Sequence, residues 1–469
     1  MEVCYNMANT GYMTLFGIDC VFFEDAKGLL VMPKDENKIR MLTKHITDTD
    51  VFVRYAYGAD KYCTALIEQI CFEQSYTIRL VPKYTIKAMT DKPFSYFEIK
   101  GDAIDDFFRP SRYFYTKAKS GNKDPIDLVY GNIVADCWNI TFEEKPVTVT
   151  LSYGDILRHG IASDLMLHPQ LKVEFPESDD PEWLYRLYLV IIRFLQFVRY
   201  DLNCGTMDIR LHGGNGKSWF NSGRIIDRHA VSPTYHSFVD EADYCAFRPF
   251  IQRILQFAAD NPNLYMHHYP ENGNRFFAQD YTPLAFSSLF GAFESECHAS
   301  KAIYECADDT KITSIRTQIL QLIDEISIDK KNTDEKQFKE NARNRISQLG
   351  TQFGQKKKIA HAYEVLARAL NSSIEHLFFR PEMRLQGALT SGQMNKIAGE
   401  IAALRGTVVH GDFTGEFSDV QGQMLRFFEV LIYAQMLKRA QIEDDGIELI
   451  IGAIFHCNYV LVNKLYHSK

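Results

Sequence analysis

The sequence lacks the features that are typical of zinc-binding, secreted and membrane-spanning proteins. Its ten cysteines are scattered and none forms a C-x-x-C pair, so we expect no zinc site and no other bound metal. The N-terminus has no basic stretch followed by an apolar one, so we expect reduced thiols in a cytoplasmic protein. The longest apolar stretch, 447–462, contains Glu448, His456 and Asn458. It is too short and too polar to span a bilayer, which predicts a buried terminal helix and no membrane association.

Positive charge is also in short supply. The chain has 52 Lys and Arg residues against 60 Asp and Glu residues, which gives a formal net charge of -8. This balance excludes a global basic field that would attract nucleic acid. Any contact with RNA must therefore come from a local patch.

The sequence is long and rich in aromatic side chains. Its 469 residues are too many for one ordinary core, so two or three domains are expected. An aromatic content of 13%, with 33 Phe and 25 Tyr, favours β-structure with large buried rings in part of the chain. The expected fold class is α+β, with a β-rich, sandwich-like N-terminal region followed by an all-α helical bundle.

Residues 1–275 are expected to form the β-rich region. Short β-branched and aromatic runs separated by turn residues predict the antiparallel strands of a sandwich or barrel. The clearest of these runs begin at Val21, Val51, Tyr76, Phe94, Val147 and Leu171. One helix is expected near 181–200, because Asp180 can cap it and Pro181 suits its first position. A further strand is predicted at 207–211.

Residues 280–469 are expected to form the helical bundle. Pro262, Pro270 and Gly273 mark the boundary zone before it. Apolar residues then recur at helical spacing in four segments, which are 312–326, 359–370, 393–404 and 420–440. A polar, charge-rich tract at 329–358 separates the first two segments.

Arg405 and His410 lie at the end of the third of these segments. Arginine keeps its charge and can grip two phosphate oxygens, whereas histidine titrates near neutrality and can move a proton. Metal-free cleavage of RNA needs a base for the 2′-hydroxyl, an acid for the 5′-oxygen and positive charge on the phosphate. These two side chains are therefore the candidate catalytic residues.

The spacing of this pair is not distinctive by itself. The same separation occurs between Arg40 and His45 and between Arg224 and His229. Those pairs lie in strand-rich or irregular segments, whereas Arg405 ends an amphipathic helix. Context rather than spacing therefore singles out the third pair.

Helix geometry adds a requirement for a second protomer. Residues five apart on a straight helix point about 140° from each other. Arg405 and His410 would converge if the helix loosened at Gly406 and a second such pair lay opposite, so we expect a homodimer or a higher homo-oligomer. The alternative is that Arg405 caps helix-end carbonyls and His410 satisfies a turn.

Two other motifs are weaker. The segment 211–218 ends in Gly-Lys-Ser like a phosphate loop, but Leu211 stands where the first glycine should be. No apolar helix follows, so a hairpin is favoured over a nucleotide site using Lys217, and no cofactor is expected. His267 and His268 lack a third ligand at helical spacing, which argues against metal binding there.

A local basic patch is present just before the second helical segment. The earlier half of the charged tract is interrupted by Asp334 and Glu335 and is typical of a solvated helix face. Lys356, Lys357 and Lys358 are uninterrupted and adjoin the helical module. They are the candidate substrate-binding residues, because lysines can contact RNA phosphates.

The segment from Arg405 to Gly411, with helices before and after it, resembles the R-x4–6-H signature of the HEPN family of small helical bundles. The resemblance covers about 280–469. It implies a metal-independent endoribonuclease whose site forms across a dimer, with the arginine and histidine of both protomers facing each other. The family usually has a polar residue directly after the arginine, where this chain has Gly406.

The whole layout is similar to the ApeA-type proteins of bacterial antiviral (anti-phage) defence, and the pieces 194–197 and 207–211 are part of this likeness. It implies that the N-terminal region senses a trigger, such as a viral protein, or restrains the HEPN domain. The HEPN domain would then cut cellular RNA such as transfer RNA. A second interpretation stays open, in which a non-catalytic HEPN module dimerises, senses, or binds RNA or a partner protein. Gly406 and the net acidity favour that alternative.

Overall fold

The computed structural model describes most of the chain. The described residues are 9–25, 27–57, 61–74, 76–88, 93–110, 133–155, 167–213, 222–227, 246–264, 268–270, 278–300, 310–327, 333–348, 354–409, 411, 413 and 415–457. They divide into two compact units, the first ending at Leu264 and the second containing 268–270 and the described residues from 278 onward. The sequence predicted this division between 275 and 280.

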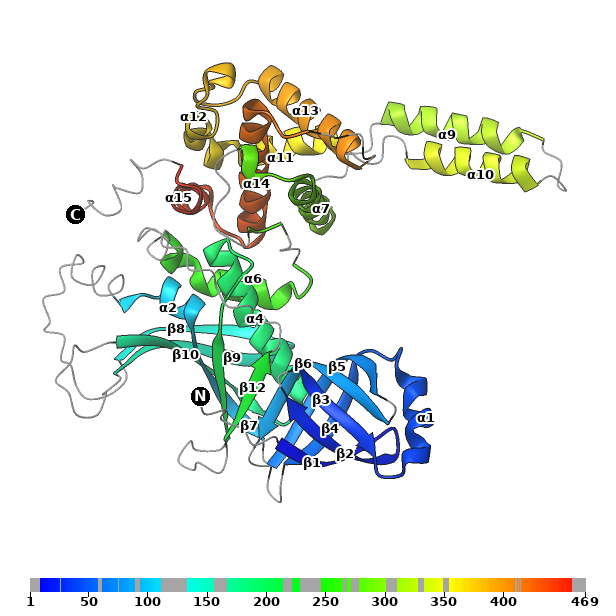
Figure 1. Ribbon diagram of the computed structural model, residues 1–469. Coiled ribbons are helices and arrows are strands. Elements are labelled where there is room, and N and C mark those ends of the chain that lie inside the picture. Colours follow the sequence, from blue (N-terminus) through cyan, green and yellow to red (C-terminus); the bar gives the residue numbers. More distant parts are fainter. Residues whose placement is uncertain are drawn as a thin grey trace, which may run out of the picture. The chain divides into compact units, whose positions relative to one another are not determined.

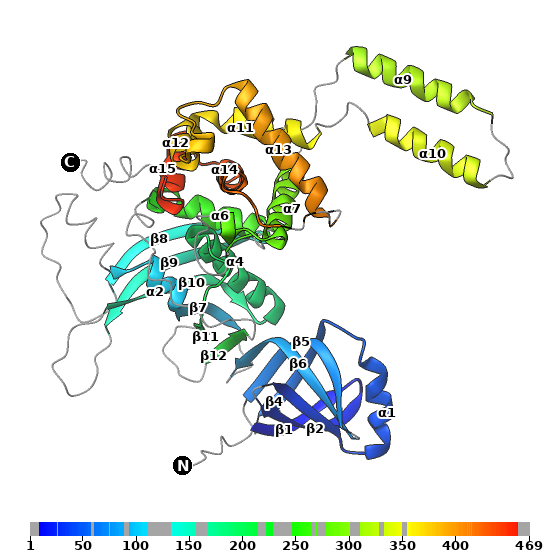
Figure 2. The same cartoon turned by 45° about the horizontal axis from the view of Figure 1, so that its top comes forward.

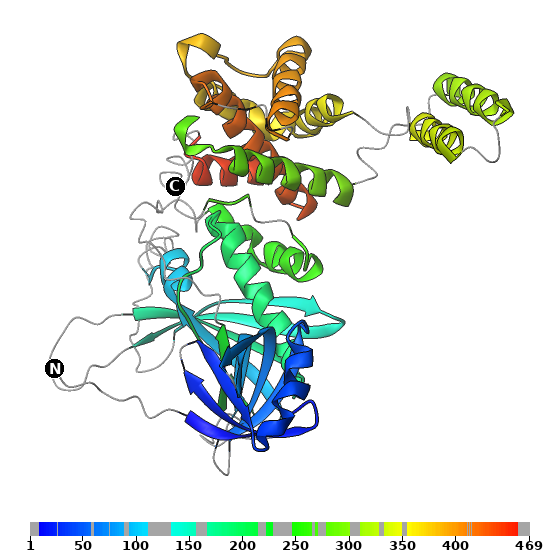
Figure 3. The same ribbon diagram turned by 45° about the vertical axis from the view of Figure 1, so that its right-hand side comes forward.

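The first unit begins with a closed β-barrel (Figures 1 and 3). Its strands are β1 (Asn9–Leu15), β2 (Ile18–Asp25), β3 (Gly28–Pro33), β4 (Val51–Tyr57), β5 (Lys61–Gln74) and β6 (Thr77–Ala88). They pair antiparallel in the order β3-β2-β1-β4-β5-β6, and β3 also pairs with β6, where Leu29 lies opposite Leu80. Gly28 has φ +134°, and a Cβ there would clash with the carbonyl oxygen of Leu80. The closure therefore requires glycine at the start of β3.

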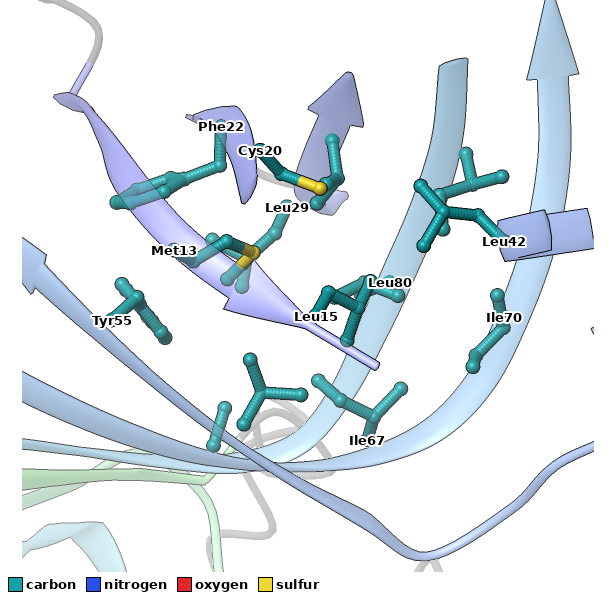
Figure 4. Close-up of a cluster of buried hydrophobic side chains, with 14 of the residues drawn as sticks. Met13, Leu15, Cys20, Phe22, Leu29, Leu42, Tyr55, Ile67, Ile70 and Leu80 are labelled. Atoms are coloured by element: carbon teal, nitrogen blue, oxygen red, sulfur yellow. The ribbon is translucent and has the colours of Figure 1, made fainter. Parts of the chain in front are cut away.

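Alternating residues of these strands fill the barrel interior. Figure 4 shows ten labelled side chains that gather inside it, which are Met13, Leu15, Cys20, Phe22, Leu29, Leu42, Tyr55, Ile67, Ile70 and Leu80. Leu42 comes from the short helix α1 (Ile39–Leu42) rather than from a strand. The strands therefore fill this core with the side chains of one face, since successive residues of a strand point to opposite sides.

The sheet continues past the barrel. Its further strands are β7 (Phe94–Gly101), β8 (Ile133–Phe142), β9 (Lys145–Asp155), β10 (Leu167–Ser178), β11 (Met207–His212) and β12 (Ser222–Asp227). They extend it from β6 in the order β12-β11-β7-β10-β9-β8. The first unit also contains the helices α2 (Asp102–Phe107), α4 (Pro181–Arg199) and α6 (Ile251–Asp260).

Helix α4 confirms the helix predicted near 181–200. The Asp180 side chain accepts hydrogen bonds from the amides of Glu182 and Trp183, and Pro181 occupies the first turn. The helix ends at Arg199, and the next residue, Tyr200, adopts a left-handed conformation with φ +49°. Within the first unit, α4 packs on the sheet. Its Tyr185 ring stacks on Tyr84 of β6 and its Trp183 ring meets Phe142 and Phe175 of β8 and β10.

The second unit is helical. It contains α7 (Pro283–Ala299), α9 (Thr310–Glu325), α10 (Thr333–Gln348), α11 (Gln355–Leu370), α12 (Ile374–Leu377), α13 (Ser391–Val409), α14 (Asp419–Arg439) and α15 (Asp444–Ile454). Every residue of α14 from Gly422 to Leu437 is buried, and Figure 2 shows this helix nearly end-on with α7, α11, α13 and α15 around it. Ser418 and Gln421 start α14 with a capping box.

The predicted fold class is confirmed: a β-rich N-terminal region precedes a helical bundle. Of the two forms that the strand pattern allowed, a sandwich or a barrel, the first six strands form a barrel, and the remaining strands extend the same sheet. The tract at 329–358, predicted only as polar, contains α10. In the stretch predicted as a terminal helix, α15 runs to Ile454 and is buried from 447 to 454 except at Glu448 and Leu449, which are partly exposed; the stretch from 458 onward lies outside the described residues. None of the described helices combines the length and apolar character needed to cross a membrane.

Candidate functional site

Arg405 lies within α13 rather than at its end. The predicted helix stopped at Leu404, but α13 continues to Val409. Gly406 is helical, so the expected loosening at this glycine does not occur. The buried side chains of Ile397, Ile401 and Leu404 hold α13 against the bundle. Their packing outweighs the cost of about 1 kcal/mol that a glycine brings to a helix.

The other half of the predicted pair, His410, lies outside the described residues. In the sequence it follows directly on Val409, the last residue of α13. The chain turns just beyond, where the Gly411 amide donates to the Val408 carbonyl at 3.2 Å and Gly411 has φ +76°. Whether Arg405 and His410 converge stays a prediction.

The Arg405 side chain is held by two residues of α7. Its Nη2 donates to Oε1 of Glu294 at 3.0 Å, and its guanidinium lies over the Phe290 ring, 5.1 Å from the ring centroid. The Gln355 Nε2 of α11 donates to the same Glu294 oxygen at 2.8 Å. Helices α7, α11 and α13 therefore meet at one carboxylate, with Arg405 and Glu294 both partly exposed, at 38% and 40%.

This arrangement leaves Arg405 able to bind a phosphate. Nη2 carries two hydrogens, one on each edge of the guanidinium plane, and Glu294 accepts through a single oxygen. Whichever hydrogen Glu294 takes, the other edge keeps a complete pair of donors for a bidentate contact. The partner seen in the described part of the chain is a carboxylate, not the helix-end carbonyls of the alternative interpretation.

The candidate substrate-binding lysines lie in and next to the first turn of α11. Lys356 and Lys357 are exposed and Lys358 is partly buried. The Lys356 side chain runs beside Gly399 of α13, where a Cβ would lie 3.8 Å from its Cε. Positive charge at a helix N-terminus opposes the helix dipole, so helix stability does not explain this triplet. Lys356 therefore lies beside the helix that carries Arg405. Its neighbour in the chain, Gln355, donates to Glu294, the partner of Arg405.

The two other arginine–histidine pairs are Arg40 with His45 and Arg224 with His229. His45 stacks on Phe16 with ring centroids 3.7 Å apart, and its Nδ1 lies 2.7 Å from Asp48. Arg224 lies on β12 with its side chain 60% exposed, and His229 lies outside the described residues. Arg40 lies in the short helix α1 rather than in a strand or an irregular segment, and Arg224 pairs with Asp208 of the neighbouring strand β11.

The phosphate-loop interpretation is not supported by the flanking structure. Strands β11 and β12 pair as an antiparallel hairpin, with His212 opposite Ser222, where a phosphate loop would lead into a helix. The loop with Lys217 lies outside the described residues, as does His267. His268 is buried with its ring against Tyr269. Among the described residues, no three His, Cys, Asp or Glu side chains are grouped as a metal site would need.

Buried charges elsewhere in the bundle hold helices together. Glu296 of α7 is 1% exposed and accepts two hydrogen bonds from Arg439 of α14, at 2.9 and 2.6 Å. Burial raises the pKa of Glu296, and Arg439 opposes that rise. Tyr281 donates to Glu429 of α14 at 2.7 Å. These contacts tie α14 to neighbouring segments and are too buried to meet a substrate.

The sequence did not reveal that Glu294, Phe290 and Gln355 surround Arg405. Glu294 is 111 residues from Arg405 in the chain. One signal was available, since Phe290 and Glu294 are four residues apart and would share one face of a helix. That spacing alone does not show which helix they meet.

Comparison with known proteins gives no match. No protein-family model matches the chain, and no curated protein or solved structure is significantly similar to it. The resemblance to HEPN proteins rests on the residues around Arg405 and His410 in this sequence.

Proposed function

We propose that this protein is a metal-independent endoribonuclease of antiviral defence that cuts cellular RNA, such as transfer RNA. The observation that carries the proposal is the placement of Arg405. Its guanidinium is oriented by Glu294 and Phe290, one donor edge remains for a phosphate, and His410 follows the helix directly. The HEPN-like signature of the segment supports the same chemistry.

Arg405 stabilises the reacting phosphate in this proposal. The phosphate gains negative charge as the 2′-hydroxyl attacks it, and a fixed guanidinium meets that charge without reorganising. Arginine suits this role because it stays protonated and offers two parallel N–H donors. The Phe290 ring beneath the guanidinium limits where it can move.

His410 carries the proton transfers. One imidazole removes the 2′-hydroxyl proton, and one protonates the departing 5′-oxygen, so the products are a 2′,3′-cyclic phosphate and a 5′-hydroxyl. A single histidine cannot fill both roles at the same instant. Two protomers, each supplying Arg405 and His410, supply both groups, which is why the proposal includes a homodimer or a higher homo-oligomer.

Lys356, Lys357 and Lys358 support binding of the RNA backbone. Together with the positive end of the α11 dipole they make a local positive region in a chain of net charge -8. Lys356 beside α13 places this region near the arginine. Binding through phosphates depends on salt, so cleavage should weaken as ionic strength rises.

The test is cleavage of total RNA by the purified protein in EDTA, with and without an extract of infected cells. Arg405→Ala and His410→Ala should each lower the rate by about a hundredfold or more. Arg224→Ala is the matched control, since Arg224 has the same spacing to a histidine and should leave the rate unchanged. Sequencing of the cut ends should find 2′,3′-cyclic phosphates. Intact RNA under every condition, or cleavage that survives both substitutions, contradicts the proposal.

A second function, a non-catalytic dimerisation or sensing module, is favoured by two observations. The carboxylate of Glu294 partly neutralises Arg405, and Gly406 stands where HEPN proteins usually have a polar residue. Such a module would bind RNA or a partner protein through the same surface without cutting. RNA binding that is lost in Arg405→Ala, with no cut ends in any sample, would select this function.

A further inference from the structure

Helices α9 and α10 form a hairpin whose described side chains make no buried core. They lie side by side in Figures 1 and 2. Lys339 of α10 donates to the carbonyls of Asp324 and Ile326 at the end of α9, which fixes the antiparallel pairing of the two helices. No described side chain of either helix is buried. Two helices that pack only on each other bury little apolar surface, so much of the isoleucine and leucine surface of α9 stays in contact with solvent.

The apolar residues of α9 follow a heptad. Ile312, Ile315, Ile319, Leu322 and Ile326 are separated by three and four residues in turn, the a and d pattern of a coiled coil. Ile315 and Leu322 are 56% and 62% exposed, and Ile326, just past the helix, is 55% exposed. Such a strip of large apolar side chains on a solvated helix is a feature that a partner would bury.

The hairpin partner α10 covers only one side of this pattern. Ile319, Leu320 and Ile323 are partly buried, whereas Ile315 and Leu322 point about 80 to 100° away from Ile323 around the helix and stay exposed. The exposed strip, made of Ile315, Leu322 and Ile326, is therefore a second face of α9, and Ile319 lies at the border between this strip and the side that carries Ile323.

We propose that this strip pairs with α9 of a second copy of the chain, in an antiparallel arrangement. A repeat of 3.5 residues matches another helix lying alongside, because that repeat keeps one seam facing a partner helix. A second copy brings the same strip, and a twofold axis makes one apolar strip complementary to itself. The inference concerns a surface separate from Arg405 and does not depend on RNA cleavage.

Charge selects the antiparallel direction. The last turn of α9 is the negative end of its dipole, yet it carries Asp324 and Glu325 and no basic residue. Arg343 of α10 pairs with Asp324 at 3.1 Å. In an antiparallel pair the positive dipole end of the second α9 lies beside Glu325, whereas a parallel pair brings the two acidic ends together.

The strip also sets the register. With Ile315 of one copy opposite Leu322 of the other, the twofold axis passes beside Gln318, which is exposed between them. Each Gln318 then faces its own counterpart. A parallel pair in register would instead place Ile315 against Ile315.

The first experiment measures the molar mass of the full chain by light scattering across a dilution series. The wild type should be dimeric, and Ile315→Glu/Leu322→Glu should lose the dimer, because it places four carboxylates in the seam. Gln321→Glu on another face of α9 is the matched control and should keep the dimer. Circular dichroism confirms that the variants stay folded. A monomeric wild type overturns both this pairing and the homo-oligomer of the proposed function, whereas a wild-type molar mass that the double substitution leaves unchanged overturns this pairing alone.

The second experiment tests direction by cysteine cross-linking, with the wild type as the background. Gln318→Cys should form a disulfide-linked dimer under mild oxidation, and so should Ile315→Cys/Leu322→Cys. Ile315→Cys alone and Gln321→Cys should not. Linkage by Ile315→Cys alone, without linkage by Gln318→Cys, indicates a parallel pair and overturns the proposal.

Discussion

The ion pair between Arg405 and Glu294 illustrates a difference between stability and orientation. Both side chains are more than a third exposed, so solvent screens their attraction and the pair adds well under about 1 kcal/mol to folding. Its effect is geometric. Glu294 is itself fixed by Gln355, and Phe290 supports the guanidinium face, so Arg405 has a defined direction before any substrate binds.

If this orientation matters, Glu294→Ala should lower the rate of RNA cleavage by about 10- to 100-fold, because a small displacement of a positioned group is costly. Glu294→Gln keeps an acceptor oxygen for Arg405 and should lose less. The thermal midpoint should hardly change in either variant. Single-turnover cleavage rates measure the effect, and a rate that rises in Glu294→Ala would show that Glu294 restrains Arg405 instead of orienting it.

A second cluster of charges, in the barrel, predicts a dependence of stability on pH. Arg79 donates to Glu73 at 2.6 Å and to Asp25 at 2.8 Å. Its hydrogen bonds lower the pKa of Glu73 below the ordinary 4.5; the pKa of Asp25 is also lowered, since Arg79 and local amides outweigh desolvation. The folded state then holds these carboxylates ionised where the unfolded chain takes up protons. The stabilisation is present above about pH 4.5 and is lost as pH falls through the lowered values.

Glu73→Gln should therefore flatten the acid side of the stability profile. The measurement is the urea midpoint of the first unit from pH 7 down to about pH 3, for the wild type and the variant. Glu68→Gln on the same strand is the control, because the carboxylates that Arg79 pairs with are Glu73 and Asp25. Parallel profiles for the wild type and Glu73→Gln would contradict the assignment.

The site could be predicted from the sequence only in part. Arg405 was identifiable because its neighbours in sequence make an amphipathic helix with a histidine just beyond. Glu294 and Gln355 were not, because they reach Arg405 through packing of three helices far apart in the chain. Local patterns specify which residues share a face, and tertiary packing decides what that face meets.

At the level of helices and strands, an element could be predicted where its sequence signals lie within one continuous segment. Helix α4 carries its cap, its first proline and its apolar stripe within one segment, and all were recognisable. Strand β8 was missed, because Asp136, Cys137 and Asn139 interrupt its apolar residues. The pairing of Leu29 with Leu80 that closes the barrel is non-local, so the choice between barrel and sandwich stayed open.

In helix α13, a glycine that was expected to weaken the helix does not interrupt it. Gly406 was expected to weaken the helix, yet it is helical and a Cβ there would meet nothing within 4 Å. Gly406→Ala should therefore raise the free energy of unfolding by about 0.5–1 kcal/mol. Gly411→Ala is the matched comparison: its φ of +76° suits glycine, so the same change should destabilise. Urea unfolding of both variants checks the pair, and destabilisation by Gly406→Ala would mean that α13 bends there in solution.

At the scale of the whole molecule, the two units have separate cores. The barrel is filled by its own cluster around Phe22 and Leu80, and the bundle is organised around the buried helix α14. A substitution can therefore weaken the first unit without touching the residues around Arg405. Because the cores are separate, the proposed restraint of the helical unit by the β-rich unit can be tested directly.

Phe22→Ala is the change that tests it. Phe22 is 1% exposed and packs edge-on against Tyr55, so its loss should destabilise the barrel by about 3–5 kcal/mol. Phe72→Ala removes the same ring from a site that is 53% exposed on β5, and it should cost far less. If the first unit restrains cleavage, Phe22→Ala should cut RNA without infected-cell extract, whereas Phe72→Ala should still need it. If Phe22→Ala lowers the unfolding midpoint but leaves trigger-free cleavage at the wild-type level, the barrel does not act as the restraint.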